Sequence, residues 1–154
     1  MIYNSADISV YCDGGSRGNP GPSACAFVIK DHFNKTIKED GKFLGTATNN
    51  IAEYNGALLA LTWLKANINS FFPEKKLDYQ NKMNINFYLD SILVASQLSG
   101  LFKIKNFVLK NLFLQIKTLE NQISFPIVYH QIPRAQNFEA DLLVNKVLDR
   151  ISSK

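Results

Sequence analysis

The chain has 154 residues, of which 46% are hydrophobic and 19% are charged, and this is the size and composition of one folded domain. These values exclude a wholly disordered chain, and no apolar run approaches the roughly 18 residues that cross a bilayer. The formal net charge of +4 permits a polyanionic partner without requiring one.

The cysteines and the first residues indicate the expected compartment. Cys12 and Cys25 are too few for a disulfide scaffold and have no metal-ligand spacing. Residues 1–10 lack the basic and apolar regions of a secretory signal. We therefore expect a cytoplasmic monomer with no membrane partner.

The first part of the chain predicts consecutive strands joined by short turns. The first strand is apolar and β-branched and ends at Asp13, before Gly14 and Gly15. Gly, Pro and Asn residues fill the loop that follows it, and these are turn formers. We expect strands at 8–12, 23–30 and 35–47. Short turns between consecutive strands favour antiparallel pairing.

A helix is predicted where the apolar period lengthens, from Asn50 to about Asn67. Its apolar residues recur at steps of three and four, as in an amphipathic helix: Ile51, Tyr54, Ala57, Leu58, Leu61 and Leu64. Thr48 and Asn49 precede it, and their side-chain oxygens can accept hydrogen bonds from its free N–H groups. The segment from 73 to 82 is predicted to be a loop.

The second half alternates strands with helices, which favours parallel pairing through right-handed crossovers. Pro126 places the last strand at a sheet edge or at a bulge. In chain order we expect a strand at 84–89, a short helix at 91–99, a helix at 106–121, a strand at 123–132 and a helix from 137 to 151. The predicted fold class is α/β, with helices on a mixed five-stranded sheet and one domain over residues 1–154.

Four acidic residues fall at the ends of these predicted elements. Asp13 ends the first strand and Asp90 the fourth, while Glu53 and Asp141 lie in the first turns of the first and last helices. Because ligands gather beyond the carboxyl ends of parallel strands, the four carboxylates can meet at one sheet edge. Their mutual repulsion there would require a cation, and an all-oxygen ligand set favours Mg²⁺, or Mn²⁺ as a substitute.

Each acid also has a purely structural explanation. Asp13 before two glycines is typical of a turn, and Asp90 before Ser91 is typical of a helix N-cap. Glu53 and Asp141 would complement helix dipoles. Each explanation is sufficient for one residue, but four acids that face one sheet edge favour a metal site.

Four segments of the chain resemble ribonuclease HI. They occur in the family's order and at similar separations across nearly the whole chain: Tyr11–Pro22, Thr48–Glu53, Leu89–Ser91 and Asn137–Asp141. Three others resemble the short form, which is found in archaeal-type and many bacterial members and lacks the basic helical extension of longer enzymes: Leu93–Gly100, Lys103–Asn106 and Ile132–Arg134. The resemblance implies a ribonuclease H-like fold, with three antiparallel strands followed by two parallel ones and helices on both faces.

The resemblance also implies an activity, which is endonucleolytic hydrolysis of the RNA strand of an RNA–DNA hybrid. The catalytic and metal-binding residues would be Asp13, Glu53, Asp90 and Asp141. Two Mg²⁺ ions would activate a water and stabilise the leaving 3′-oxygen, and the products would carry a 5′-phosphate and a 3′-hydroxyl. Asp13 is the best candidate to bridge the ions, because a central strand holds it most rigidly.

The matching segments further imply a set of substrate contacts. Asn19, Asn49 and the backbone at Gly14 and Gly15 would follow the RNA strand in the minor groove, where the 2′-hydroxyls are accessible. Thr48 would contact a DNA phosphate. The full expected set is Gly14, Gly15, Asn19, Thr48, Asn49 and Arg134.

The sequence departs from the longer enzymes at two positions. Their histidine before the last helix is absent, and Arg134 stands there as a residue that can hold a phosphate but cannot act as a general base. His130 lies upstream inside a predicted strand, where we expect a structural role. Ile92 occupies a position at which long forms carry a substrate-contacting glutamine.

Other features leave alternatives open. Lys103, Lys105 and Lys110 would meet the DNA backbone or form a solvated helix face, and Trp63 is expected to pack in the core. A binder of hybrids or of double-stranded RNA would gain nothing from clustered acids. Strand-transfer and junction-resolving nucleases share the acids but lack the Asn-Pro-Gly string at 19–21 and the Thr-Asn-Asn string at 48–50. Cleavage of double-stranded RNA stays open.

Overall fold

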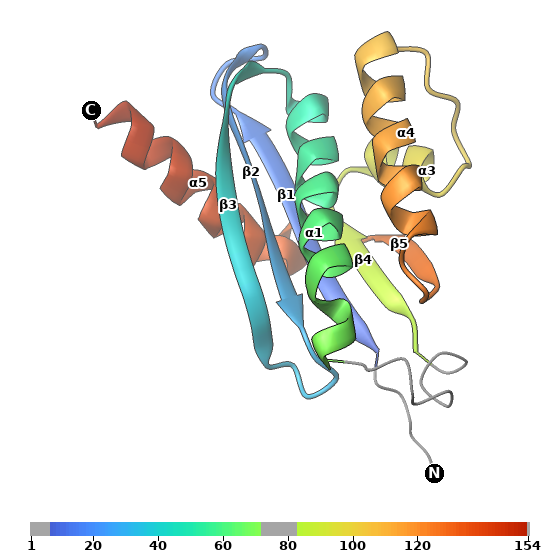
Figure 1. Ribbon diagram of the computed structural model, residues 1–154. Helices are drawn as coiled ribbons and strands as arrows, with labels where there is room; N and C mark the ends of the chain where they lie inside the picture. Colours follow the sequence, from blue (N-terminus) through green and yellow to red (C-terminus); the bar gives the residue numbers. More distant parts are fainter. Residues whose placement is uncertain (1–6, 72–82, 154) are drawn as a thin grey trace.

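The computed structural model describes residues 7–71 and 83–153 and is drawn as a ribbon in Figure 1. Strands and helices alternate along the second half of the chain, as their apolar periods predict. In chain order the elements are β1 (Ile8–Ser16), β2 (Gly21–Lys30), β3 (Thr36–Ala47), α1 (Asn49–Phe71), β4 (Ile85–Leu89), α3 (Ile92–Leu98), α4 (Phe107–Asn121), β5 (Ile127–Gln131), the 3-10 turn η1 (Arg134–Asn137) and α5 (Phe138–Ser152).

The strands form one mixed five-stranded sheet in the order β3-β2-β1-β4-β5. β1, β2 and β3 pair antiparallel, while β4 lies parallel to both β1 and β5. This confirms the predicted α/β class and the expectation of three antiparallel strands followed by two parallel ones. The central strand β1 has an antiparallel neighbour, β2, and a parallel neighbour, β4. Its ladder with β4 ends at the Tyr11–Tyr88 pair, while its ladder with β2 continues to the Ser16–Ser23 pair.

Helices cover both faces of the sheet (Figure 1), as expected. On one face α1 and α4 enclose the larger core, which includes Val10, Phe27, Leu61 and Phe87. On the other face α5 packs on β2 through a smaller cluster: Ala24, Ala26, Val144 and Leu148. Because β2 has a helix on each side, all of its residues from 23 to 29 are buried.

Several predicted boundaries were wrong for identifiable reasons. β1 does not end at Asp13 but runs to Ser16, because β2 supplies pairing partners beyond the glycines. β5 begins at Ile127 and not at 123, since Pro126 has no N–H for the ladder and its carbonyl accepts instead from Ile85. The predicted loop at 73–82 lies outside the described residues.

Side chains at the helix ends explain where helices begin. The Thr48 hydroxyl accepts a hydrogen bond from the Ile51 N–H at the start of α1. The Ser91 hydroxyl accepts from Val94 at the start of α3, and Gly100, with φ +81°, follows the end of that helix. No helix among the described residues has the length and apolar character to traverse a bilayer.

Candidate active site

Asp13 lies in the middle of the sheet, two residues past the end of the β1–β4 ladder. The residue is 6% exposed. It shares a face of β1 with Gly15, at which an added Cβ would lie 3.5 Å from Val144 Cγ1 of α5. Gly14 points the other way, where a Cβ would lie 2.2 Å from the Ala52 carbonyl carbon of α1. The absent side chain at Gly14 therefore lets α1 approach the backbone beside Asp13.

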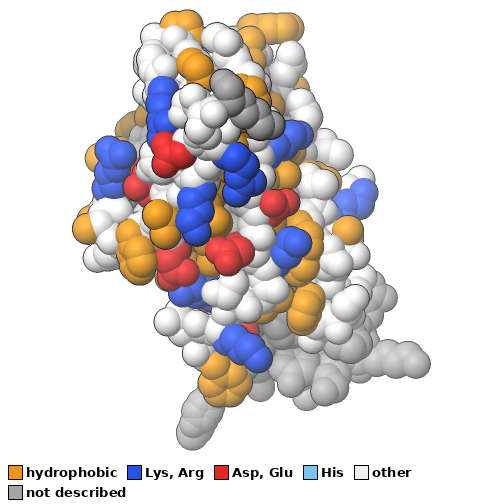
Figure 2. Space-filling view, turned by 90° about the vertical axis from the view of Figure 1, so that its left-hand side faces the viewer, with side chains coloured by type: hydrophobic (Ala, Val, Ile, Leu, Met, Phe, Trp, Pro, Cys, Tyr) orange, Lys and Arg blue, Asp and Glu red, His pale blue; other side chains and the backbone are white. Residues whose placement is uncertain are grey.

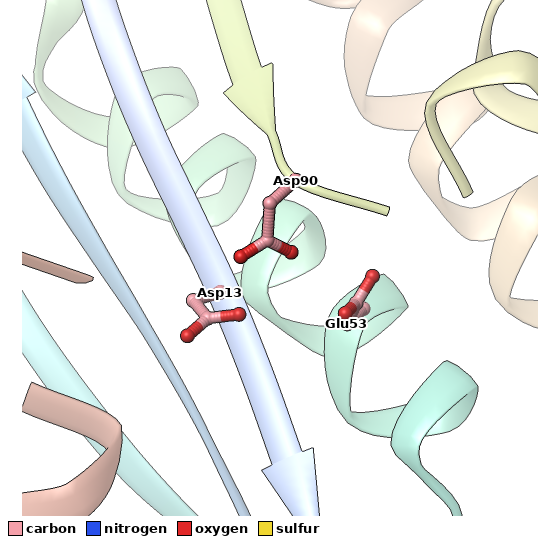
Figure 3. Close-up of side chains that lie close together, drawn as sticks. All are labelled: Asp13, Glu53 and Asp90. Carbon is pink, nitrogen blue, oxygen red and sulfur yellow. The ribbon is translucent and has the colours of Figure 1, made fainter. Parts of the chain in front are cut away.

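Glu53 and Asp90 converge with Asp13 (Figure 3). Asp90 follows the last residue of β4, and Glu53 extends from α1. One carboxylate oxygen from each of the three residues lies within 4.8 Å of the others. Glu53 is the fifth residue of α1, not a residue of its first turn, and Ser91 rather than Asp90 caps α3. Neither structural explanation considered for these two acids applies.

Asp141 lies in the first turn of α5 and lines the same cleft, although it is not one of the three clustered acids. Its carboxylate faces Asp13 and lies 3.7 Å from the Arg134 guanidinium, measured from Oδ1 to Nη2. The structure therefore brings all four sequence-predicted acids to one cleft, three of them tightly. It also places the exposed cation of Arg134 at the rim.

Burial and the charges of neighbouring acids favour the protonated forms of the three clustered acids, Asp13, Glu53 and Asp90. Loss of solvent, followed by the negative charge of Asp90, raises the pKa of Asp13 to about 8. Loss of solvent and the charges of Asp90 and Asp13 raise the pKa of Glu53 to about 8 as well. Burial also raises the pKa of Asp90, which Arg134 partly offsets. Carboxylates that are costly to ionise together are well suited to a bound cation.

The donor atoms of the cluster fit a hard divalent cation. All of them are carboxylate oxygens, the ligand type that Mg²⁺ and Mn²⁺ prefer. The Glu53 Oε2 atom is buried and has no hydrogen-bond partner among the described residues. A buried acceptor without a donor is costly, and coordination to a cation would satisfy it. The residues present therefore fit the predicted metal.

The acids lie in a cleft of about 340 Å³. Its lining includes four of the six expected substrate-contact residues, which are Gly14, Gly15, Asn49 and Arg134. Asn19 and Thr48 do not line it. Thr48 caps α1, and the Asn19 side-chain carbonyl accepts a hydrogen bond of 3.0 Å from the Asn49 N–H.

Polar side chains hold the loop between β1 and β2 against the start of α1. The Asn49 side-chain carbonyl accepts a 2.9 Å hydrogen bond from the Ser16 N–H, while Asn19 reaches the Asn49 backbone. Each of these contacts uses the amide oxygen. Among the described residues neither Nδ2 group donates a hydrogen bond, so both are available as donors, and Asn49 lines the cleft.

Arg17 is a cleft residue that the sequence analysis missed. Its guanidinium forms an ion pair of 2.5 Å with Asp149 of α5, and it contacts Asn145. The only available signal was a basic residue within a turn-forming loop, and the partner lies 132 residues away in the sequence. The pairing depends on the tertiary fold and could not be read from spacing.

Two other residues singled out earlier lie in packed surroundings. The His130 ring stacks on Tyr88 with 5.0 Å between centroids, and its Nε2 atom lies 2.9 Å from Asn86 Oδ1. Trp63 packs at the edge of the main core. Neither belongs to the cleft lining.

Comparison with known proteins gives close relatives. Residues 5–149 match the RNase H family. The chain is 33% identical over 142 residues to ribonuclease HI of Halobacterium salinarum, covering 92% of this chain and 64% of that protein. It is 35% identical over 143 residues to a bifunctional protein of Mycobacterium tuberculosis. That alignment covers 92% of this chain and 35% of the relative, so the chain spans about a third of that protein's length.

A solved structure agrees with the sequence relatives. LC11-RNase H1, in complex with an RNA/DNA hybrid, superposes with a TM-score of 0.82 at 35% sequence identity, covering 94% of this chain and 98% of that one. The match over residues 5–149 and the shared architecture lead to one conclusion: the chain belongs to the RNase H family.

Proposed function

We propose that this protein is a ribonuclease H, which hydrolyses the RNA strand of RNA–DNA hybrids with the help of divalent cations. The observation that carries the proposal is the convergence of Asp13, Glu53 and Asp90 within 4.8 Å, in a cleft that Asp141 also lines. Membership of the RNase H family and the hybrid bound to LC11-RNase H1 support the same substrate.

The four acids would hold two Mg²⁺ ions, with Mn²⁺ as a substitute. The bound ions would supply an activated water and neutralise charge on the leaving 3′-oxygen, giving 5′-phosphate and 3′-hydroxyl ends. Asp13 lies in the central strand β1, where its backbone pairs with Ala26 of β2, and it is our candidate for a ligand shared by both ions. Arg134, whose guanidinium lies 3.7 Å from Asp141, would hold a substrate phosphate but could not act as a general base.

The polar groups beside the acids would select the RNA strand. The Nδ2 groups of Asn19 and Asn49 and the backbone at Gly14 and Gly15 would contact the minor groove. Only RNA offers the 2′-hydroxyl there, as both donor and acceptor. Thr48, at the start of α1, would contact a DNA phosphate, since a helix N-terminus favours an anion.

The proposal is tested by incubating labelled RNA–DNA, RNA–RNA and DNA–DNA duplexes side by side in Mg²⁺, in Mn²⁺ and in EDTA. We expect cleavage of the RNA strand of the hybrid in either metal and none in EDTA. Asp13→Asn and Asp90→Asn should abolish it, because each removes a clustered ligand. The RNA–RNA arm decides whether double-stranded RNA is also a substrate.

Intact hybrid in both metals would contradict the proposal. If the protein also shifted the hybrid in a gel equally well with and without EDTA, the non-catalytic binder considered above would be the better account.

A further inference from the structure

Asn137 is a buried polar residue at the junction between η1 and α5. The residue is 1% exposed. Its Nδ2 group donates a 2.8 Å hydrogen bond to the carbonyl oxygen of Cys12. That carbonyl belongs to the peptide group joining Cys12 to Asp13, just past the Tyr11–Tyr88 end of the β1–β4 ladder. The amide therefore fixes the backbone directly before Asp13.

The same amide also faces Asp90. A hydrogen bond from Asn137 favours the charged form of the Asp90 carboxylate. An amide nitrogen carries two hydrogens, so one Nδ2 group can serve the Cys12 carbonyl and the Asp90 carboxylate together. Since both acceptors are oxygens, the opposite orientation of the amide would set Oδ1 against the Cys12 carbonyl. The contacts thus fix the orientation of the side chain.

A helix-capping role does not explain this residue. Asn137 occupies the N-cap position of α5 and is a favoured residue type there, but its side chain forms no capping hydrogen bond. Its Oδ1 atom, which would cap the helix, is buried without a partner among the described residues. An unpaired buried acceptor costs stability. The side chain therefore makes its hydrogen bonds to β1 and Asp90 and leaves the N-terminus of its own helix uncapped.

We propose that Asn137 is a positioning residue that fixes Asp13 and Asp90 relative to each other for cation binding. This inference rests on the proposed function. With 1% exposure, Asn137 is too deeply buried to contact a hybrid, so it acts only through the two acids. It would hold the cluster in the geometry that the cations need before they bind.

The test measures Mn²⁺ binding by calorimetry, without substrate, for the wild type, Asn137→Ala and Asn137→Asp. Loss of a residue that orients metal ligands typically costs about 10–100-fold in metal affinity or activity. We expect a loss of this size for Asn137→Ala and at least as large a loss for Asn137→Asp. The aspartate fills the same volume but would put a carboxylate oxygen against the Cys12 carbonyl and Asp90.

Asn55→Ala is the matched control. Asn55 lies two residues from Glu53 in α1. Its side chain donates a hydrogen bond of the same length, 2.8 Å, to the Ile51 carbonyl and not to a clustered acid. It should bind Mn²⁺ like the wild type. In hybrid cleavage, Asn137→Ala should lower kcat, raise the Mg²⁺ concentration for half-maximal rate and leave KM unchanged. Circular dichroism checks that each variant is folded.

The outcomes separate this inference from the proposed function. If the wild type cleaves hybrid and both folded Asn137 variants bind Mn²⁺ with wild-type affinity, the positioning role is wrong and the nuclease proposal stands. A KM increase with unchanged Mn²⁺ affinity would also overturn it. If the wild type neither binds Mn²⁺ nor cleaves hybrid, the proposed function itself fails.

Discussion

Asp13 and Glu53 have pKa values near 8, far above those of free carboxylic acids, because burial and neighbouring acids disfavour their charged forms. The folded, metal-free protein therefore binds protons at these groups that the unfolded chain releases at about pH 4. At neutral pH this arrangement opposes folding, and a bound divalent cation would remove the opposition. The clustered acids thus suit cation binding but lower the stability of the metal-free protein at neutral pH.

This linkage predicts an unusual pH dependence of stability. Between about pH 4 and pH 8 the native state holds more protons than the unfolded state, so the free energy of unfolding should fall as pH rises. The fall should stop near pH 8, the folded-state value. Urea unfolding in EDTA at pH 5, 6, 7 and 8 should show wild-type stability declining relative to Asp13→Asn, which lacks one titrating group and relieves Glu53.

Added Mg²⁺ should raise the melting temperature more at pH 8 than at pH 5, because protons compete with it at low pH. If the free energy of unfolding changed with pH in the same way for the wild type and for Asp13→Asn, this explanation of the raised pKa values would be contradicted.

At the scale of elements, the site depends on how closely α1 packs against β1. Gly14 on the strand and Gly56 on the helix provide the space, since a Cβ at Gly56 would lie 2.8 Å from the Asp13 carbonyl oxygen. This contact sets the distance from Glu53, on the helix, to Asp13, on the strand. A helix displaced outward would separate the two carboxylates.

Two neighbouring glycines provide a matched test of this packing. Gly14→Ala places a Cβ 2.2 Å from the backbone of Ala52, and such overpacking should lower the free energy of unfolding by about 1–3 kcal/mol or more. In Gly15→Ala the added Cβ meets only Val144 Cγ1, at 3.5 Å, so the free energy of unfolding should change by less than about 1 kcal/mol. Denaturant titration measures both, and equal effects would show that the contact with α1 does not matter.

Much of this arrangement followed from the sequence because apolar periods and turn residues are local signals. They gave every strand and the order in which antiparallel pairing gives way to parallel pairing. The glycines after Asp13 led to the wrong end for β1. In sequence, a glycine that ends a strand cannot be distinguished from a glycine that lets a helix pack closely against it. The convergence of the four acids could be predicted from their approximate places in the elements, although Asp13 lies inside β1 and Glu53 lies beyond the first turn of α1.

The roles of Asn137 and Arg17 could not be predicted in the same way. Each depends on a partner more than 100 residues distant, Cys12 for Asn137 and Asp149 for Arg17. Asn137 also looked like an ordinary helix start. Long-range side-chain pairs carry no periodic signal, and only the packing of α5 against β1 and β2 brings these residues together.

At the scale of the whole molecule, the charge is modest and mixed. Figure 2 shows acidic and basic side chains interspersed over the side on which α5 and β3 lie in Figure 1, and no uniformly basic surface there. With a net charge of +4, long-range attraction to a polyanion is limited. Hybrid affinity should therefore depend on a few local contacts with phosphates.

Exposed lysines between α3 and α4 and at the start of α4 are the candidates for such contacts. Changing Lys103, Lys105 and Lys110 together to Gln should weaken hybrid binding and reduce the salt dependence. Each lost phosphate contact lowers the slope of log K against log salt by about 0.9. The control changes three lysines of the β3 region, Lys35, Lys38 and Lys42. Fluorescence anisotropy at several salt concentrations gives the slopes, and equal slopes for both triple variants would exclude this surface.

The central claim is that Asp13, Glu53 and Asp90 together bind divalent cations. Diffraction from a crystal soaked in Mn²⁺, recorded at the manganese absorption edge, tests it most directly. We predict an anomalous peak between the three carboxylates of the wild type, lost in Asp13→Asn. A wild-type crystal with no peak at this cluster, or with manganese bound only elsewhere, would contradict the account.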